Sequence, residues 1–469
     1  MNQASHNFDY DAVVIGGGSG GFAAARTLTD EGAKTAVIEG GGQLGGLCIL
    51  RGCMPTKALL YAAEVYHLMK HCGTWGLQCN DPGFQFREVI KRKDQLIKEF
   101  ANYRAEQLEN GKFDLIRETA RFLDPHTLEL SDGRQLTSAH FVISTGSVVS
   151  PPPIKALESV GYITSDEALC MEQPPNSMIV LGGGPIALEF AQFFSRLDVA
   201  VHLIQRNRQV LKTMDSDLTT ELVNSLKDEG MHVYTGAEIL TASTTEHEKK
   251  IQIRHQGNTL TIRAESILMA LGRSPNTGSL NLKATGVKTI RNRIETDTSM
   301  RTATPHIFAA GDCTGPHEIV HIAIQQGEIA AANILNPEKS AAIDYRLLSS
   351  IVFTDPQLAM VGMTEKQAKD AGIPILTASY PFNDHGKSMI MDTHHGIVKL
   401  IAHRETGEIL GGGVTGPLGG ELIHEIIVAM HHRTTVQQFA AIPHYHPTLS
   451  EIWTYPAEEL ADQVTASDA

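Results

Sequence analysis

Cys48 and Cys53 lie five residues apart in the segment GGLCILRGCMPTK, a spacing that could support thiol–disulfide chemistry. The pattern from Ala58 onward predicts a helix, and Pro55 suits its first turn. In a regular helix, Cα atoms five residues apart are separated by roughly 8.6 Å, whereas a disulfide requires about 7 Å or less. A bridge therefore needs a distorted segment, which Gly52 allows, and a strained bridge is easily reduced.

The surroundings of this pair also bear on its chemistry. A helix N-terminus and the nearby Lys57 would lower a thiol pKa and favour the thiolate. A metal half-site and two unrelated thiols remain alternatives, although no second Cys/His pair with ligand spacing follows. We expect the remaining thiols to be inert or buried; they are Cys72, Cys79, Cys170 and Cys313.

A thiol couple needs a base, and the segment AAIPHYHPTLSEIWTYP offers His446 with Glu451, separated by a turn containing Pro447. A carboxylate in this position can hold an imidazole in one tautomer and so orient a general base. His444 could form a metal pair with His446, but no third ligand is evident and we predict no metal site. We interpret four other histidines as an exposed polar face: His394, His395, His431 and His432.

These residues need a scaffold, and the first glycine cluster indicates one. Residues 12–15 form an apolar strand pattern, residues 22–28 a helix pattern, and residues 35–38 a second strand that ends at Glu39. The turn between them has G-x-G-x-x-G spacing, with glycines at Gly16, Gly18 and Gly21. These parts form a dinucleotide-binding fingerprint, in which the acid accepts hydrogen bonds from a ribose.

The same pattern recurs in SMIVLGGGPIALEFAQFFSRLDVAVHLIQRNRQVLK, around Gly182, Gly184 and Ala187. Its second strand, residues 200–204, leads into the basic sequence that contains Arg206, with Lys212 beyond it. A guanidinium can bind a 2′-phosphate that a carboxylate would repel, so the pattern favours NADPH over NADH. A solvated basic loop is the alternative. Two dinucleotide sites in one chain imply electron transfer between two cofactors.

Composition limits the remaining possibilities. The chain has 469 residues and a formal net charge of −14, which argues against a nucleic-acid or anionic-membrane partner. No apolar run approaches the ~20 residues needed to span a bilayer, and the first residues show no secretory signal, so we expect a cytoplasmic protein. Six cysteines are too few for a disulfide scaffold at this length.

These motifs together resemble the pyridine nucleotide–disulfide oxidoreductases, the family of dihydrolipoamide dehydrogenase, glutathione reductase and mercuric reductase. The similarity runs from end to end, and includes STGS at 144–147, LGRSPN at 271–276, FAAGD at 308–312 and HPTLSE at 446–451. It implies an α/β fold: two Rossmann-like domains, for FAD and NAD(P), and a C-terminal α+β dimerisation domain. Four segments follow: 1–149 and 271–342 for FAD, 150–270 for NAD(P), and 343–469 for dimerisation, with 457–469 as a frayed tail.

The resemblance also implies residue roles. Cys48 would exchange with substrate and Cys53 would contact the flavin. Lys57 and Glu189 would form the ion pair beside the flavin, where nicotinamide stacks. His446 and Glu451 would serve the partner chain's active site, so a homodimer is expected. Asp312 would bind the ribityl chain of FAD and Glu39 its ribose, and the other implied cofactor contacts are Ser19, Ala120, Thr145, Gly146, Gly272 and Arg273.

The resemblance gives mixed indications about the substrate. HPTLSE, and His321 in IVHIAIQQG, are similar to dihydrolipoamide dehydrogenase, whereas ALEFAQFFSRL is closer to mercuric reductase. The last cysteine is Cys313, which argues against mercury, and Glu328 would repel a glutathione carboxylate although Ser19 and Arg26 are shared with glutathione reductases. We expect a dihydrolipoamide-dehydrogenase-like enzyme with NADPH capability acting on a lipoyl group of a carrier protein. An NADPH-dependent reductase of a small-molecule disulfide, a mercuric-reductase-like enzyme and a non-catalytic redox sensor are the alternatives.

The disulfide pocket itself departs from the family pattern. The usual GGTCxNxGCxPSK is GGLCILRGCMPTK here, and the departing neighbours of the cysteines are Leu47, Leu50, Arg51 and Met54. The substrate could therefore be a non-standard one.

Overall fold

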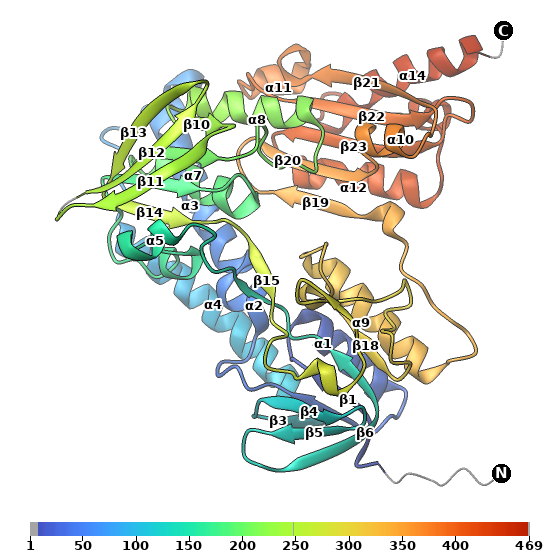
Figure 1. Ribbon diagram of the computed structural model, residues 1–469. Helices are drawn as coiled ribbons and strands as arrows, with labels where there is room; N and C mark the ends of the chain where they lie inside the picture. The colour runs from blue at the N-terminus through green and yellow to red at the C-terminus, as the bar shows by residue number, and fades with distance from the viewer. Residues whose placement is uncertain (1–7, 247, 468–469) are drawn as a thin grey trace. The chain divides into compact units, whose positions relative to one another are not determined.

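The computed structural model describes residues 8–246 and 248–467. The chain passes back and forth between two compact units, drawn in Figure 1. Unit 1 holds the chain up to Pro55, Lys91–Pro151 and Gly272–Asp344, and unit 2 holds Thr56–Ile90, Pro152–Leu271 and the chain from Tyr345. The four segment boundaries expected from the sequence stay predictions.

Unit 1 is built on a mainly parallel sheet of order β3-β2-β1-β6-β5-β4, with β18 also paired to β6. Its strands are β1 (Tyr10–Ile15), β2 (Thr35–Ile38), β3 (Asp114–Ile116), β4 (Ala120–Asp124), β5 (Thr127–Leu130), β6 (Gln135–Ile143) and β18 (Ile307–Ala309). The central strand β1 lies parallel to both β2 and β6. Because both faces of a parallel sheet are covered, residues 12–15 of β1 and 35–38 of β2 are continuous buried runs, as predicted.

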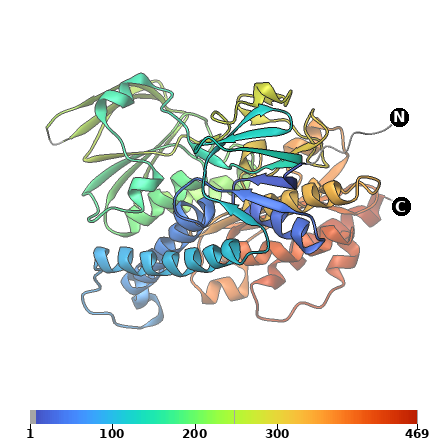
Figure 2. The same cartoon turned by 90° about the horizontal axis from the view of Figure 1, so that it is seen from below.

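Helices α1 (Ser19–Asp30) and α9 (Val320–Leu335) pack closely against one another in this unit. A Cβ atom on Gly327 would lie 2.1 Å from the carbonyl oxygen of Gly20, so only glycine permits this approach. A third helix, α4 (Phe86–Glu109), is a single continuous helix, light blue in Figure 2.

The cysteine segment forms two consecutive helices, α2 (Gly46–Arg51) and α3 (Cys53–His71), with Gly52 between them. The predicted helix is therefore present and begins at Cys53. A 3-10 turn, η1 (Cys72–Trp75), follows α3.

Unit 2 contains a second parallel sheet, of order β10-β9-β8-β14. Its strands are β8 (Ser177–Leu181), β9 (Ala200–Gln205), β10 (His232–Thr235) and β14 (Ser266–Met269), with helices α7 (Pro185–Arg196) and α8 (Ser216–Asp228). The short helices α5 (Lys155–Val160) and α6 (Ser165–Ala168) precede them. A separate antiparallel sheet follows, with β11 (Glu238–Thr244), β12 (Lys249–His255) and β13 (Asn258–Ala264).

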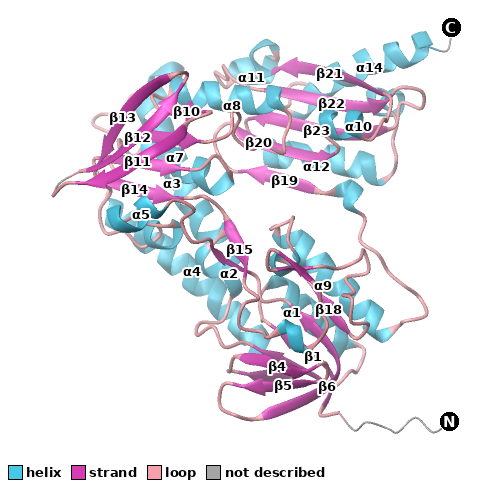
Figure 3. Cartoon of the chain, viewed as in Figure 1, coloured by secondary structure: helices cyan, strands magenta, loops and turns pink. Residues whose placement is uncertain are grey.

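The C-terminal part of unit 2 is a five-stranded antiparallel sheet of order β19-β20-β23-β22-β21, seen in magenta in Figure 3. Its strands are β19 (Ser349–Val352), β20 (Gln357–Gly362), β21 (Ile375–Pro381), β22 (Ile397–His403) and β23 (Ile409–Gly416). Its helices are α10 (Glu365–Asp370), α11 (Gly386–Ile390), α12 (Gly419–His431), α13 (Val436–Ala440) and α14 (Thr454–Ser467).

The expected frayed tail at 457–469 is wrong for the described residues, because α14 continues to Ser467. Ala457, Leu460 and Val464 are buried in the core of the C-terminal sheet, and this apolar burial holds the helix in place. Residues 468–469 lie outside the described part of the chain. The α/β class with two Rossmann-like folds and a C-terminal α+β region is confirmed.

Candidate active site

The Cys48–Cys53 segment is distorted at Gly52, as the disulfide hypothesis requires. A Cβ atom at this position would lie 3.0 Å from the carbonyl oxygen of Leu47 and 3.2 Å from Cys48 Cα. The break brings α2 to an end and makes Cys53 the first residue of the 19-residue helix α3. The positive end of a helix favours a thiolate. Both cysteine side chains are half-buried.

Lys57 lies one turn further along α3 and forms an ion pair with Glu189 of α7. The Lys57 Nζ atom is 2.9 Å from Oε2 and 3.0 Å from Oε1 of the carboxylate. The backbone N–H of Phe353 donates a further hydrogen bond of 3.0 Å to Glu189 Oε1, and the Lys57 ammonium lies 4.5 Å from the centre of the Phe353 ring. Glu189 is almost fully buried, so the lysine compensates a carboxylate removed from water.

His446 and Glu451 are in contact, as the sequence predicts. Nδ1 of His446 lies 3.0 Å from Glu451 Oε2. The imidazole is exposed and the carboxylate is buried, with side-chain exposures of 77% and 11%. Because Nδ1 faces the carboxylate, Nε2 is the nitrogen left for a proton acceptor role.

The first fingerprint forms a tight turn between β1 and α1. A side chain on Gly16, whose φ is +106°, would strike the carbonyl oxygen of Ser144 at 2.3 Å, and one on Gly21 would strike that of Gly16 at 1.8 Å. Glu39 Oε2 accepts a hydrogen bond of 2.8 Å from Gly17 N, and Oε1 accepts one of 2.9 Å from Gly41 N. The fingerprint backbone thus orients the carboxylate that would bind a ribose.

Asp312 belongs to a polar network in the same unit. Ser147 Oγ donates to Asp312 Oδ2 over 2.6 Å, and Arg273 donates to the hydroxyl and carbonyl oxygens of Ser147, each at 2.8 Å. Arg273 and Gly272, expected at the cofactor, therefore lie where β15 (Arg273–Pro275) pairs with β7 (Ser147–Val149). Ser147 was missed by the sequence reasoning, although it closes the STGS motif.

These features fit FAD. The glycine turn opens onto the N-terminus of α1 beside Ser19, and helix N-termini bind phosphates. Thr145 Oγ1 is a buried hydroxyl for which the described residues provide no hydrogen-bond partner, which is consistent with a bound group supplying one. Its neighbour Gly146 adopts a φ of +68°. Ala120, at the start of β4, is half-buried.

The second fingerprint repeats the first with one difference. Gly182 N donates to the carbonyl of Ile204 as Gly16 N does to that of Ile38. A Cβ atom on Gly183 would lie 2.8 Å from the side chain of Gln205, so Gln205, and not Arg206, lies in the position of Glu39. Gly184 has open space around its Cα, and Ala187 is buried in α7. The basic side chains nearby are exposed: Arg206, Arg208 and Lys212.

The other four cysteines, and the histidines that the sequence was expected to place on an exposed face, lie outside this geometry. Cys313 is fully buried, which raises its pKa to about 12, whereas Cys170 is exposed and Cys72 and Cys79 are half-buried. His395 corrects the expected exposed face, because it is half-buried with Nε2 2.8 Å from Asp228. His444 pairs with Glu425 at 2.6 Å, and no cluster of three potential metal ligands occurs in the described chain.

Comparisons with known proteins agree with this geometry. The sequence profile described as "Pyridine nucleotide-disulphide oxidoreductase" matches residues 10–327, and that of the family's dimerisation domain matches residues 348–457. The chain belongs to the pyridine nucleotide-disulphide oxidoreductase family. It is 33% identical to a dihydrolipoyl dehydrogenase of Bacillus subtilis over 94% of this chain and 96% of that protein. It is 32% identical to a mercuric reductase of Staphylococcus aureus over 92% and 78%.

Solved structures of this oxidoreductase family match as well. The HOCl-induced flavoprotein disulfide reductase RclA from Escherichia coli superposes with a TM-score of 0.83 at 26% identity, over 96% of this chain and 99% of that one. As a family member, the protein is a flavoprotein that uses FAD and NAD(P)H, and its dimerisation domain supports a homodimer. No helix of the described residues is long and apolar enough to cross a membrane.

Proposed function

We propose that this protein is a dihydrolipoamide-dehydrogenase-like enzyme that moves electrons between NAD(P)H and a lipoyl group through a Cys48–Cys53 disulfide. The observation that carries the proposal is the break at Gly52, which places Cys53 at the start of α3 directly after the helix that holds Cys48. A homodimer, a lipoyl carrier protein as partner and a cytoplasmic location belong to the same proposal.

The thiol chemistry proceeds by two exchanges. One thiolate of the reduced substrate attacks Cys48 Sγ, forms a mixed disulfide and releases Cys53 as a thiolate. The second substrate thiol gives its proton to His446 of the partner subunit and attacks the substrate sulfur of the mixed disulfide. Cys48 then leaves and is protonated by that imidazolium, so the substrate is oxidised by two electrons and the enzyme couple is reduced. The reverse sequence reduces a substrate disulfide.

Two contacts made by carboxylates support this chemistry. Bound FAD would supply a two-electron carrier between the cysteine couple and the nicotinamide. Lys57 presents a fixed positive charge held by Glu189, and the Phe353 N–H fixes the carboxylate. Glu451 holds the Nδ1 edge of His446, which leaves Nε2 to move protons.

The substrate class is favoured by the Arg26–Glu328 ion pair. The two side chains meet at 2.7 Å in unit 1, with each less than half exposed. Glu328 thus engages Arg26 and would itself repel a glutathione carboxylate, whereas a neutral lipoamide requires no cation. The 33% sequence identity to a dihydrolipoyl dehydrogenase also favours a lipoyl substrate.

A second candidate is an NADPH-dependent reductase of a small-molecule disulfide. The absence of an acid at Gln205, together with exposed Arg206 and Arg208, favours the phosphorylated nucleotide. The flavoprotein disulfide reductase RclA, similar over its whole length, supports this alternative.

Steady-state kinetics with NADH and NADPH in parallel, across lipoamide, glutathione disulfide and coenzyme-A disulfide, test both candidates. We expect the highest kcat/KM with lipoamide, and loss of all disulfide turnover in Cys48→Ser while FAD stays bound. Retention of lipoamide turnover in that variant would contradict the proposal. A preference for another disulfide would favour the second candidate.

A further inference from the structure

We propose that His385 is a positioning residue for the His446–Glu451 pair, holding the carboxylate through a chain that begins at Ser388. The inference rests on the proposed function of that pair as base and orienter. His385 precedes the short helix α11 and is fully buried, with 0% of its surface exposed. The sequence analysis assigned it no role, because nothing in the local pattern connects it to Glu451.

Glu451 lies between two imidazoles. His446 Nδ1 is 3.0 Å from Oε2, and His385 Nε2 is 3.2 Å from Oε1, on the buried side. No described residue gives this buried Nε2 a well-aligned hydrogen bond, so the carboxylate oxygen is the partner within reach. A polar atom removed from water without that contact would be costly.

The Glu451 carboxylate decides which nitrogen of His385 carries the proton, and Ser388 contacts the other nitrogen. Ser388 Oγ lies 2.8 Å from His385 Nδ1. An ionised carboxylate can only accept, so a neutral His385 must carry its proton on Nε2, and the serine hydroxyl then donates to Nδ1. Burial lowers the pKa of His385, against the opposing effect of Glu451, so the neutral form with one donor and one acceptor fits both partners.

Aromatic neighbours hold the buried ring in its plane. The Tyr455 ring meets His385 edge-on, with centroids 6.2 Å apart, and Tyr380 stacks on Tyr455 at 4.0 Å. Tyr380 also donates from its hydroxyl to the Asp384 carbonyl over 3.0 Å. The titratable groups around His385 are therefore Glu451, His446 and Tyr455, with Asp384 beside it in the chain.

This arrangement sets the direction of the catalytic imidazole. With Oε1 held by His385, the Glu451 carboxylate cannot rotate away from His446, and the exposed Nε2 of His446 keeps its orientation toward substrate. Loss of His385 would leave the carboxylate free to turn. Displacements of about 1 Å in such a group can slow a reaction about 100-fold.

The test compares holoenzyme variants in two half-reactions. His385→Leu removes the polar contact, His385→Gln keeps an N–H donor, Ser388→Ala removes the hydroxyl, and His394→Gln changes an exposed histidine of the same loop as a control. The first readout is the pH profile of kcat and kcat/KM for lipoamide turnover. The second is the single-turnover rate of flavin reduction by NADPH, in which Glu451 takes no part.

We expect His385→Leu to lower disulfide turnover about 10- to 100-fold and to change the pH profile. Both effects follow because a carboxylate that can turn away no longer holds His446 in one orientation. Flavin reduction stays unchanged. His385→Gln recovers part of the loss, Ser388→Ala shows a smaller change in the same direction, and His394→Gln matches the wild type.

Unchanged turnover and pH profile in folded, FAD-containing His385→Leu and Ser388→Ala would overturn the inference. Equal losses in both half-reactions would also overturn it, because they indicate a structural role only. If His385→Leu does not fold, the contrast between His385→Gln and Ser388→Ala decides the question. Failure of the proposed function is distinct: there the wild type itself lacks disulfide turnover, or His446→Gln equals the wild type.

Discussion

Gln205 lies over the turn of the second fingerprint in the same position that Glu39 occupies over the first. Glu39 accepts a hydrogen bond from the Gly17 backbone, and the Gln205 side chain packs against Gly183. An acidic residue in this position binds a free ribose, whereas a neutral one tolerates a 2′-phosphate. The difference between the two residues therefore bears directly on the nicotinamide cofactor.

The first prediction concerns this cofactor choice. Arg206→Ala combined with Arg208→Ala should lower kcat/KM for NADPH about 100-fold or more, because each charge-assisted contact is worth about 1.5–3 kcal/mol. The kcat/KM for NADH should hardly change, because NADH has no 2′-phosphate. Initial rates with both nucleotides measure the ratio, with Arg134→Ala, which changes an exposed arginine of unit 1, as a control. An equal loss with both nucleotides would argue against the phosphate role.

The second prediction concerns the break between α2 and α3. Gly52→Ala places a methyl group 3.0 Å from the Leu47 carbonyl oxygen and 3.2 Å from Cys48 Cα. We expect slower disulfide turnover, because the segment must shift at the cysteine that exchanges with substrate, and a larger loss for Gly52→Val. Gly73→Ala is the matched control, since a methyl group there meets nothing within 4 Å. Wild-type turnover in Gly52→Val would refute the role of the break.

The third prediction concerns the Lys57–Glu189 ion pair. Glu189→Gln keeps an acceptor for the Phe353 N–H but removes the charge that holds Lys57. We expect flavin reduction by NADPH to slow about tenfold or more, since positioned charges of this kind supply much of an active site's effect. Stopped-flow absorbance measures the rate. Asp198→Asn removes the charge that pairs at 2.8 Å with Lys70, another lysine of α3, and should leave the rate unchanged.

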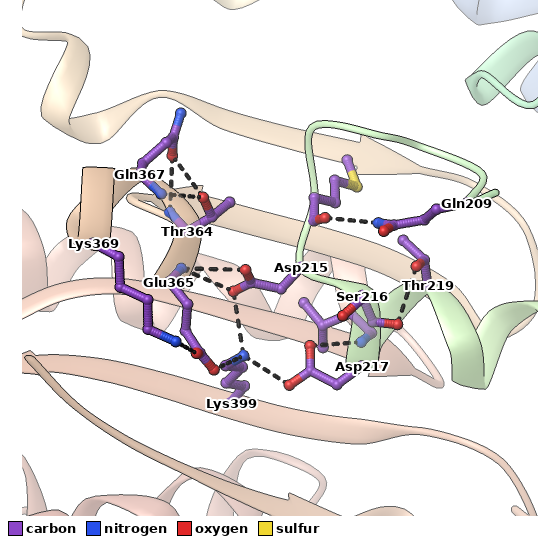
Figure 4. A network of polar contacts seen from close by, with 12 residues as sticks. Gln209, Asp215, Ser216, Asp217, Thr219, Thr364, Glu365, Gln367, Lys369 and Lys399 are labelled. Atoms are coloured by element: carbon purple, nitrogen blue, oxygen red, sulfur yellow. Dashed lines mark hydrogen bonds and ion pairs between the residues drawn. The ribbon is translucent and has the colours of Figure 1, made fainter. Parts of the chain in front are cut away.

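The fourth prediction concerns a buried lysine in unit 2, shown in Figure 4. Lys399 is 4% exposed and its Nζ lies 2.6 Å from Glu365, 2.7 Å from Asp217 and 3.4 Å from Asp215. Burial alone would lower the pKa of Lys399, but its hydrogen bonds to Asp217 and Glu365 outweigh burial and raise it. The cation therefore persists through neutral pH.

Lys399→Met should destabilise the protein by about 3–5 kcal/mol at neutral pH, because it leaves the buried Asp215 carboxylate without its counter-charge. The hydrogen bond from Lys399 lowers the pKa of Glu365 from its ordinary value, so the stabilisation is fully present above that ordinary pKa and fades as pH falls below it. Burial raises the pKa of Asp215. As pH falls, this carboxylate is therefore protonated at a higher pH than an ordinary aspartate, and the variant no longer carries its unpaired charge.

The destabilisation should consequently be larger at pH 7.5 than at pH 5, as measured by the midpoint of thermal unfolding of the holoenzyme. Lys369→Met is the control, since its exposed pair with Glu365 is worth under about 1 kcal/mol. A loss of stability in Lys399→Met that is larger at pH 5 than at pH 7.5 would contradict this prediction.

Local patterns were sufficient to predict both fingerprints. The apolar runs 12–15 and 35–38 became parallel strands because each is buried on both faces. The helix break at Gly52 was also predictable, because two cysteines five residues apart cannot approach along a regular helix.

Other features depend on contacts between distant parts of the chain, and no local signal predicts these. His385 meets Glu451 only because the sheet brings the loop after β21 beside the segment before α14. Residues 457–469 were expected to fray as the end of the chain, whereas α14 is held by Ala457, Leu460 and Val464, whose burial depends on the C-terminal sheet. The sequence does not show which of Gln205 and Arg206 corresponds to Glu39. The hydrogen bond from Gly182 N to the Ile204 carbonyl matches that from Gly16 N to the Ile38 carbonyl, and it places Gln205 in the position of Glu39.

The central claim is that Cys48 and Cys53 form the redox couple, and counting thiols tests it most directly. The chain has six cysteines. The account predicts four titratable thiols in the denatured oxidised protein and six after anaerobic reduction with NADPH, whereas in Cys53→Ser the count is the same before and after. Six thiols in the wild type before NADPH is added, with no increase afterwards, would contradict the account.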